Sequence, residues 1–154
     1  MSANFSTSNR MYFLTLQEFG EDDLLIQEMS GTEAVSKLFE FRLRLISSRD
    51  DIDVRKIIGK TAILRIETYD SGHMGGELHW NGYVSRFARS GRNHSVDGEY
   101  LYTYECDIVP WFWFMTQHED CRIFQNKTVR EIVETIFGEF DYSDFLFELT
   151  ADHP

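Results

Sequence analysis

Apolar and polar residues alternate most regularly in two stretches, residues 39–45 and 100–109. In the first stretch every second residue is apolar, beginning with Phe39 and Phe41, and the residues between them are charged. In the second stretch aromatic or aliphatic residues mainly alternate with acidic and hydroxyl residues, until Pro110 removes a backbone donor. This period of two predicts two β-strands with one buried face each, and it places Phe39 and Phe41 in the structural core.

Shorter apolar runs predict further strands on both sides of these two. The run 77–89 is expected to pair with 99–109 as a hairpin, and Gly82 in its middle predicts a bulge or a sharp bend. Asp53 is expected to cap one helical turn, which Gly59 ends. The remaining predicted strands span 11–16, 24–29, 61–67 and 145–149.

A longer helix is predicted after Thr128. Thr128 and Glu131 have the spacing of a capping box, and apolar residues recur at helical spacing from Val129 to Phe137. This apolar stripe needs a partner surface, and the aromatic run 111–115 just upstream is the nearest candidate. We therefore expect the structural core of this region to contain Trp111, Trp113, Phe124, Ile132, Val133 and Ile136.

Together these elements predict a mainly β fold with minor α content. Several short strands joined by hairpin turns, with one or two short helices, are typical of a partly closed antiparallel β-barrel. Residues 1–10 are rich in Ser and Asn and are expected to form a flexible lead-in. Residues 11–154 are expected to form a single barrel domain.

Composition narrows the partners that this fold can have. Apolar residues make up 42% of the 154 residues and aromatic residues 15%, which favours a folded globule. The formal net charge of −11 argues against binding to nucleic acid or to an anionic membrane, because both require a basic face. We see no signal peptide and no membrane-spanning run, so we expect synthesis in the cytoplasm. Cys106 lies on the apolar side of its strand and is expected to be a buried, reduced thiol.

No group of residues has the spacing of a catalytic, cofactor or metal site. The five histidines lack the spacing of a ligand pair, and the segment from His118 to Cys121 lacks an identifiable partner for a cysteine nucleophile. The glycines between residues 72 and 76 lack the lysine of a phosphate-binding loop. We therefore predict that the chain is not an enzyme and needs no cofactor. Arg42 and Arg44 form either the solvated face of a strand or a subunit contact.

Two ordered motifs resemble the amino-terminal region of the VgrG family. The first is the run from Pro110 to Phe114, followed by the run from Cys121 to Val129 and by Glu131-Ile132. VgrG proteins are the spike proteins of type VI secretion systems, and their first half is similar to the tail-hub protein of contractile phages. Family members carry P-W-L-W-L-L, then R-I-F-Q-(D/N)-K-(T/S)-V leading into E-I.

The second motif lies upstream, between residues 31 and 66. Family members carry G-x-E-x-(L/I)-S-x-x-F-x-F, then L-x-L and (L/I)-G-K-x-A-x-L-x-I, and this chain departs from them at Val35. A family hairpin that often reads H-G-x-V has Asn81 in place of the histidine. The resemblance covers nearly everything after Met11 and implies that the chain is the first hub-like barrel of a longer protein, cut near its carboxyl end.

What the resemblance implies for function is structural. The full-length protein would be a homotrimer whose paired barrels form a ring of six. That ring would adapt the spike to a tube of Hcp-type protein, contact baseplate components, and be expelled when the sheath contracts. The net charge and the absence of a long apolar run indicate no nucleic-acid partner and no membrane anchor. The expected subunit contacts are Arg42, Arg44, Tyr83 and Arg86.

Two alternatives stay open at this point. The chain could be the hub protein of a prophage or of another contractile injection particle. In a different class, it could be a small-molecule-binding or enzymatic β-barrel with the aromatic run 111–115 lining a pocket.

Overall fold

The computed structural model describes residues 10–17, 19–70, 73–94 and 100–148. These residues fall into two compact units that divide after Pro110. The flexible lead-in lies outside the described residues except for Arg10, and a single domain across 11–154 stays a prediction.

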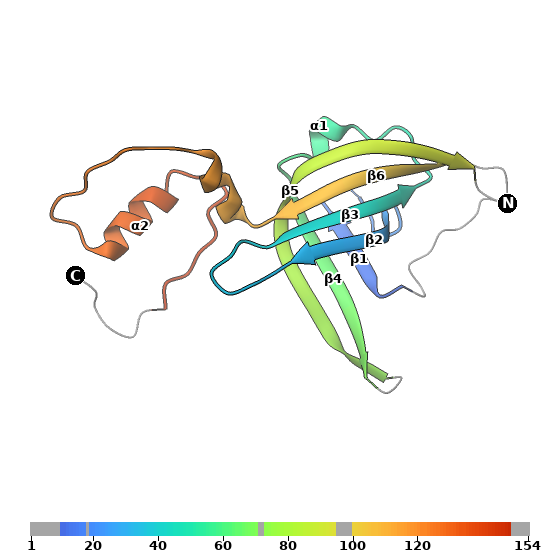
Figure 1. Ribbon diagram of the computed structural model, residues 1–154, viewed down its shortest axis with the longest axis horizontal. Coiled ribbons are helices and arrows are strands. Elements are labelled where there is room, and N and C mark those ends of the chain that lie inside the picture. Colours follow the sequence, from blue (N-terminus) through green and yellow to red (C-terminus); the bar gives the residue numbers. More distant parts are fainter. Residues whose placement is uncertain (1–9, 18, 71–72, 95–99, 149–154) are drawn as a thin grey trace. The chain divides into compact units, whose positions relative to one another are not determined.

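The first unit is one antiparallel sheet of six strands in the order β1-β4-β5-β6-β3-β2 (Figure 1). Its edge strands β1 and β2 approach one another without sharing a ladder, so the sheet is curled but not closed. The prediction of a mainly β, antiparallel architecture with few short helices is confirmed, and the predicted barrel is open between β1 and β2. The strands are β1 Tyr12–Leu16, β2 Leu25–Thr32, β3 Glu40–Ser47, β4 Thr61–Asp70, β5 His73–His94 and β6 Tyr100–Val109.

The core of this unit lies on the concave side of the sheet. Alternation in β3 buries Phe41, whose ring lies 5.0 Å from that of Trp80, and Phe39 packs against the same cluster. Cys106 on β6 is fully buried, and this burial raises the pKa of its thiol to about 12. The predicted thiol Cys106 and the predicted core residue Phe41 are therefore both buried, whereas Phe39 packs against the same cluster and is half-buried.

Strand β5 takes part in both halves of the sheet. Its first half pairs with β4 and its second half with β6, and the change of partner occurs at Tyr83. Two alternatives are predicted at Gly82, a bulge or a sharp bend. The bulge is wrong, because Gly82 pairs regularly with Ala62, and the bend stays a prediction. The register shifts in the β5–β6 ladder instead fall at Ser85 and Ser90. Gly82 serves a different purpose, since the backbone of β6 leaves no room there for a side chain.

Short helix α1, Val54–Ile57, follows β3 as the sequence predicts. The carboxylate of Asp53 accepts a hydrogen bond of 3.1 Å from the backbone N–H of Arg55, which caps the helix. The chain leaves the helix through Gly59, whose φ of 77° is a conformation that glycine adopts without strain.

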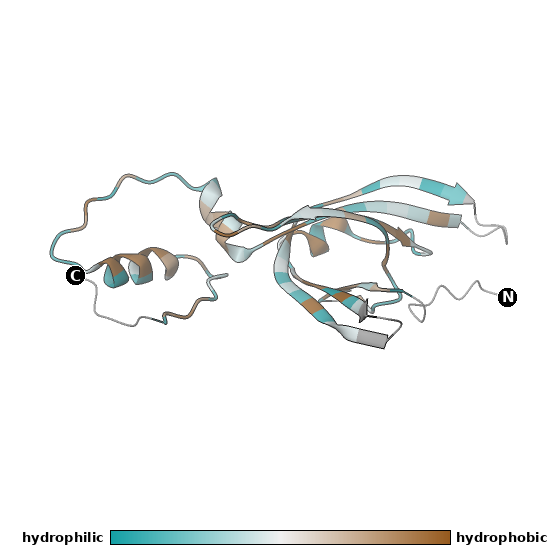
Figure 2. Ribbon diagram, turned by 60° about the horizontal axis from the view of Figure 1, so that its bottom comes forward, coloured by the Kyte–Doolittle hydropathy of each residue, from teal (hydrophilic) through white to brown (hydrophobic). Residues whose placement is uncertain are grey.

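The second unit contains the 3₁₀ helix η1, Trp111–Gln117, and the helix α2, Val129–Phe137. The predicted capping box is present: the Glu131 side chain accepts from the Thr128 N–H at 2.7 Å, and Thr128 Oγ1 accepts from the Glu131 N–H at 3.3 Å. Helix α2 is amphipathic (Figure 2). Its Phe137 ring lies 5.0 Å from that of Trp111, so the upstream aromatic run is the predicted partner of the stripe. Within the described residues, no helix is both long and apolar enough to cross a membrane.

Burial in the second unit corrects part of the sequence prediction. None of the described side chains after Pro110 is buried, because so few residues cannot surround a side chain on all sides. The six residues predicted as core in this unit are each partly exposed: Trp111, Trp113, Phe124, Ile132, Val133 and Ile136.

The strand predicted at 145–149 is also wrong over its described part, residues 145–148, while residue 149 lies outside the described range. The aromatic residues of this segment instead contact other rings. Phe145 lies 4.8 Å from Phe137, and the Arg130 guanidinium lies 5.6 Å from the centre of the Phe147 ring. The alternation of the segment therefore serves side-chain packing rather than a ladder.

Candidate functional site

The outer face of β2, β3, β6 and β5 gathers charged side chains around a surface depression of about 270 Å³. We refer to this surface as the charged face. It includes three of the four arginine and tyrosine residues predicted as subunit contacts. Its charged residues are Glu28, Arg42, Arg44, Arg86, Glu105 and Asp107.

Strand register builds this face from positions far apart in the sequence. Arg44 on β3 lies opposite Glu28 on β2 and opposite Glu105 on β6. In the adjacent row, Arg42 lies opposite Asp107, and Asp107 lies opposite Arg86 on β5. Directly opposed residues of antiparallel strands point to the same side of the sheet. Opposite charges therefore meet in two cross-strand rows.

Ion pairs connect most of these residues. Arg86 lies 2.6 Å from Glu105 and 3.6 Å from Asp107, and Arg44 lies 3.0 Å from Glu28. The hydrogen bond from Arg86 to Glu105 and the nearby Asp107 carboxylate raise the pKa of Arg86. Such exposed pairs mainly set orientation and specificity rather than stability.

Exposure varies strongly across the charged face. The side chain of Asp107 is 14% exposed, whereas those of Arg42 and Glu28 are 68% and 66% exposed. Arg42 pairs along its own strand with Glu40 at 2.9 Å. The centre of the face is thus internally neutralised, and the most accessible charges lie at Arg42 and Glu28. The arrangement suits recognition of another charged surface.

Tyr83, the fourth predicted contact, does not line the depression. It is half-buried and lies opposite Val109 at the point where β5 changes partner. The structure therefore brings together Arg42, Arg44 and Arg86 and leaves Tyr83 outside the group.

The acidic members of the face were not named as contacts from the sequence. Glu105 and Asp107 alternate outward along β6, and this signal is visible in the sequence. Their position beside Arg42 and Arg44 depends on pairing between β3 and β6, which are far apart in the chain. No local pattern specifies that pairing.

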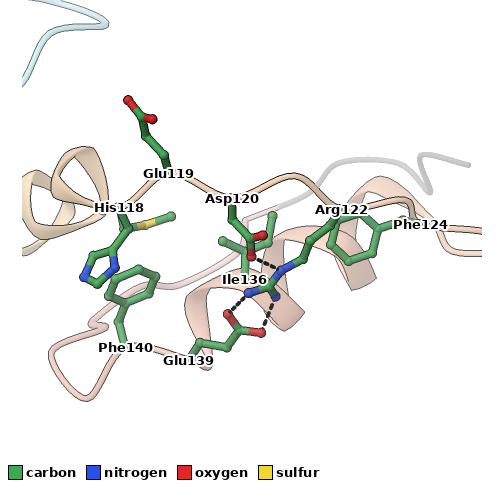
Figure 3. A pocket seen from close by; sticks show the side chains of 9 residues that line it. His118, Glu119, Asp120, Arg122, Phe124, Ile136, Glu139 and Phe140 are labelled. Carbon is green, nitrogen blue, oxygen red and sulfur yellow. Dashed lines mark hydrogen bonds and ion pairs between the residues drawn. The ribbon is translucent and has the colours of Figure 1, made fainter.

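A second depression of about 390 Å³ lies within the second unit (Figure 3). Arg122 crosses it and pairs with both Asp120 and Glu139, with a distance of 2.7 Å from Nη2 to the Glu139 carboxylate. The hydrogen bond from Arg122 lowers the pKa of Glu139. Arg122 thus connects the loop before α2 to Glu139, which lies two residues after the last residue of that helix.

The segment His118-Glu119-Asp120-Cys121 has no catalytic arrangement in this depression. The His118 ring lies edge-on to Phe140, with a distance of 5.4 Å between the ring centres, and Glu119 points away from the Arg122 cluster (Figure 3). Cys121 is exposed and free. Within the part of the chain that the structure describes, no cluster of metal-ligating side chains is found.

Most of the chain is similar in sequence to known proteins. Residues 32–154 match the family model described as phage tail baseplate hub (GPD). Two similar proteins are the type VI secretion system spike proteins VgrG1b and VgrG1a of Pseudomonas aeruginosa. They are 33% identical over 126 residues and 33% identical over 134 residues, which cover 82% and 87% of this chain. This chain spans only 16% and 19% of their respective lengths.

A solved structure supports the fold. The chain resembles the E. coli c3393 protein, described as a component of the type VI secretion system with structural similarity to the T4 bacteriophage tail proteins gp27 and gp5. The TM-score is 0.66 at 23% identity, over 92% of this chain and 36% of that one.

Proposed function

Because this chain belongs to the phage tail baseplate hub family, we propose that it forms the first hub barrel of a type VI secretion spike protein. The matches to two spike proteins of that system support this assignment. The proposed role is structural, and it assigns no reaction and no cofactor to the chain.

The charged face is the observation that carries this proposal. Its arginines and carboxylates lie in two rows on a rigid sheet, and its most exposed members, Arg42 and Glu28, have opposite charges. Such a surface can pair with a neighbouring subunit that offers the complementary order of charges. In the proposed assembly, Arg42, Arg44 and Arg86 contact the adjacent barrel, and Tyr83 lies beside that contact.

The partners follow from the same proposal. The longer protein would assemble as a homotrimer, and its ring of barrels would meet a tube of Hcp-type protein and components of the baseplate. The protein would be made in the cytoplasm and expelled with the tube. The spike proteins that match this chain belong to a secretion system, which agrees with that route.

The test uses this chain as bait for purified Hcp-type tube protein, together with sedimentation to measure self-association. We expect binding or self-association that the Arg42→Glu/Arg44→Glu variant weakens at least about tenfold. The variant places one glutamate opposite Asp107 and the other opposite Glu28 and Glu105. The matched control is Arg55→Glu/Lys56→Glu on α1, which changes the net charge by the same amount at a different surface. The proposal fails if neither interaction is seen, or if both variants weaken it equally.

A second candidate, the hub of a prophage particle, is favoured by the description of the matching family. It predicts capture of a phage tail-tube protein in preference to the Hcp-type protein. The same bait tests both proteins side by side.

A further inference from the structure

Strands β5 and β6 carry a second set of arginines, on the face opposite to the charged face. The Arg89 guanidinium stacks over the Tyr102 ring at 4.3 Å, and the Arg92 guanidinium stacks over the Tyr100 ring at 4.4 Å. These four residues are called here the Arg–Tyr strip. The two stacks have the same geometry. In the ladder Arg89 lies opposite Tyr104 and Arg92 lies opposite Tyr102, and each arginine stacks on the tyrosine two residues before its partner on β6.

A β-bulge places the two arginines on one face. Residues three apart on a regular strand point to opposite sides of the sheet. Here the ladder shifts at Ser90, so that Arg89 lies opposite Tyr104 and Arg92 lies opposite Tyr102. The Ser90 hydroxyl donates to the Thr103 carbonyl at 3.4 Å across this bulge. Because of the extra residue Ser90, Arg89 and Arg92 lie at neighbouring positions on the same face of the sheet, although they are three residues apart in the sequence.

Neither Arg89 nor Arg92 forms an ion pair with any residue in the described part of the chain. By contrast, Arg86, three residues before Arg89 on β5, forms ion pairs with the carboxylates of Glu105 and Asp107. Both arginines of the strip are exposed. The ladder between β3 and β6 ends at Tyr102, so β3 does not extend along the rest of β6 toward Tyr100.

The spacing of the two arginines matches an extended peptide. Their partners Tyr104 and Tyr102 are two residues apart on β6, which corresponds to about 7 Å along a strand. Side chains at alternate positions of an extended peptide have the same separation. A guanidinium stacked on a ring keeps its N–H edge available for a carboxylate.

We propose that the Arg–Tyr strip binds an extended acidic segment of a protein partner, with carboxylates at alternate residues. The charge of the strip selects an acidic ligand, and Tyr and Arg are the residues enriched where protein interfaces are strongest. Nucleic acid is the weaker match, because its binding requires a basic groove with many phosphate contacts, whereas the strip supplies two arginines. This proposal uses a different surface from the charged face and stands without the proposed spike function.

The probe is a fluorescein-labelled peptide of eight residues in which threonine and glutamate alternate, and its binding to the purified chain is followed by fluorescence anisotropy at low ionic strength. We expect the Arg89→Gln/Arg92→Gln variant to raise the Kd at least about tenfold. The control variant Arg55→Gln/Lys56→Gln removes the same charge from α1 and is expected to change the Kd less than about twofold. Comparison peptides carry glutamine in place of glutamate, or the same residues with the four glutamates in one block.

Three results would overturn the proposal: no binding of the alternating peptide by the unaltered chain, an equal loss in the two double variants, or tighter binding of a labelled single-stranded oligonucleotide than of the peptide. Thermal unfolding of each variant checks that the sheet is intact. The Arg89→Lys/Arg92→Lys variant keeps both charges, so weaker peptide binding by the folded variant reports the loss of the planar guanidinium.

Discussion

The backbone at Gly82 lies so close to Val109 that a Cβ atom at position 82 would stand 2.7 Å from the Val109 carbonyl oxygen. It would also stand 2.8 Å from a methyl carbon of Ile108. Neither neighbour can withdraw easily, because both belong to β6 and Ile108 is fully buried. The substitution Gly82→Ala is therefore expected to lower the free energy of unfolding by about 2–3 kcal/mol, measured by chemical denaturation.

Gly91 on the same strand is the matched control. A Cβ atom there would meet the Thr103 side chain at 3.8 Å, an ordinary contact distance. Gly91→Ala is expected to change the free energy of unfolding by less than about 1 kcal/mol. Equal losses in the two variants would contradict the close approach at Gly82.

The capping box of α2 predicts a specific loss of helix. Thr128→Ala removes the hydroxyl that accepts from the Glu131 N–H and is expected to cost about 1 kcal/mol of local stability. Hydrogen exchange of the amides in the first turn of α2 measures this cost. Thr128→Ser keeps the hydroxyl and should retain protection of those amides. A loss in both variants would show that the methyl group, rather than the cap, matters.

Acid should loosen the contact between Arg122 and Glu139. Because the pKa of Glu139 is lowered in the folded chain from its ordinary 4.5, the ionised carboxylate stabilises the fold above that value. The stabilisation is lost as the pH falls through the lower folded pKa. In Arg122→Gln, we expect the pKa of Glu139 to return toward 4.5, measured by NMR titration of its carboxyl carbon. Arg130→Gln removes a different pair, with Glu134, and should leave the titration of Glu139 unchanged.

The two cysteines should differ sharply in reactivity. Cys106 is fully buried, and its pKa is raised to about 12, whereas Cys121 is exposed. The thiolate is the reactive form, so an aromatic disulfide reagent should modify one thiol in the folded chain and two in denaturant. Cys121→Ser should abolish the reaction of the folded chain. Rapid modification of that variant would contradict the packing of β6.

The sequence predicts those parts of the fold that depend on residues close together in the chain. Alternation alone places Phe41 inside and Arg42 outside, and the Thr128–Glu131 spacing alone predicts the cap of α2. The charged face could not be predicted from local patterns alone. Arg42 lies opposite Asp107 only because β3 pairs with β6, and these strands are about 60 residues apart in the chain. Its arginines were predictable as outward residues, but their carboxylate partners were not.

Other features have no local signature at all. A bulge at Ser90 depends on how two strands pair, and a single serine gives no indication of it. A glycine within a strand predicts a bulge or a bend, whereas Gly82 marks a close approach of two backbones. The alternation at 145–148 failed for a related reason: aromatic rings in this unit provided a better partner than a strand edge.

Strand β5 runs without a break from the β4 ladder into the β6 ladder. A force applied to the hairpin of β4 and β5 would therefore be transmitted to the β6 end of the sheet through the backbone of β5. Its transmission would not depend on the hydrogen bonds between strands. The two halves cannot slide apart unless that single chain is extended. We therefore expect the sheet to resist extension along β5 more strongly than widening of the gap between β1 and β2.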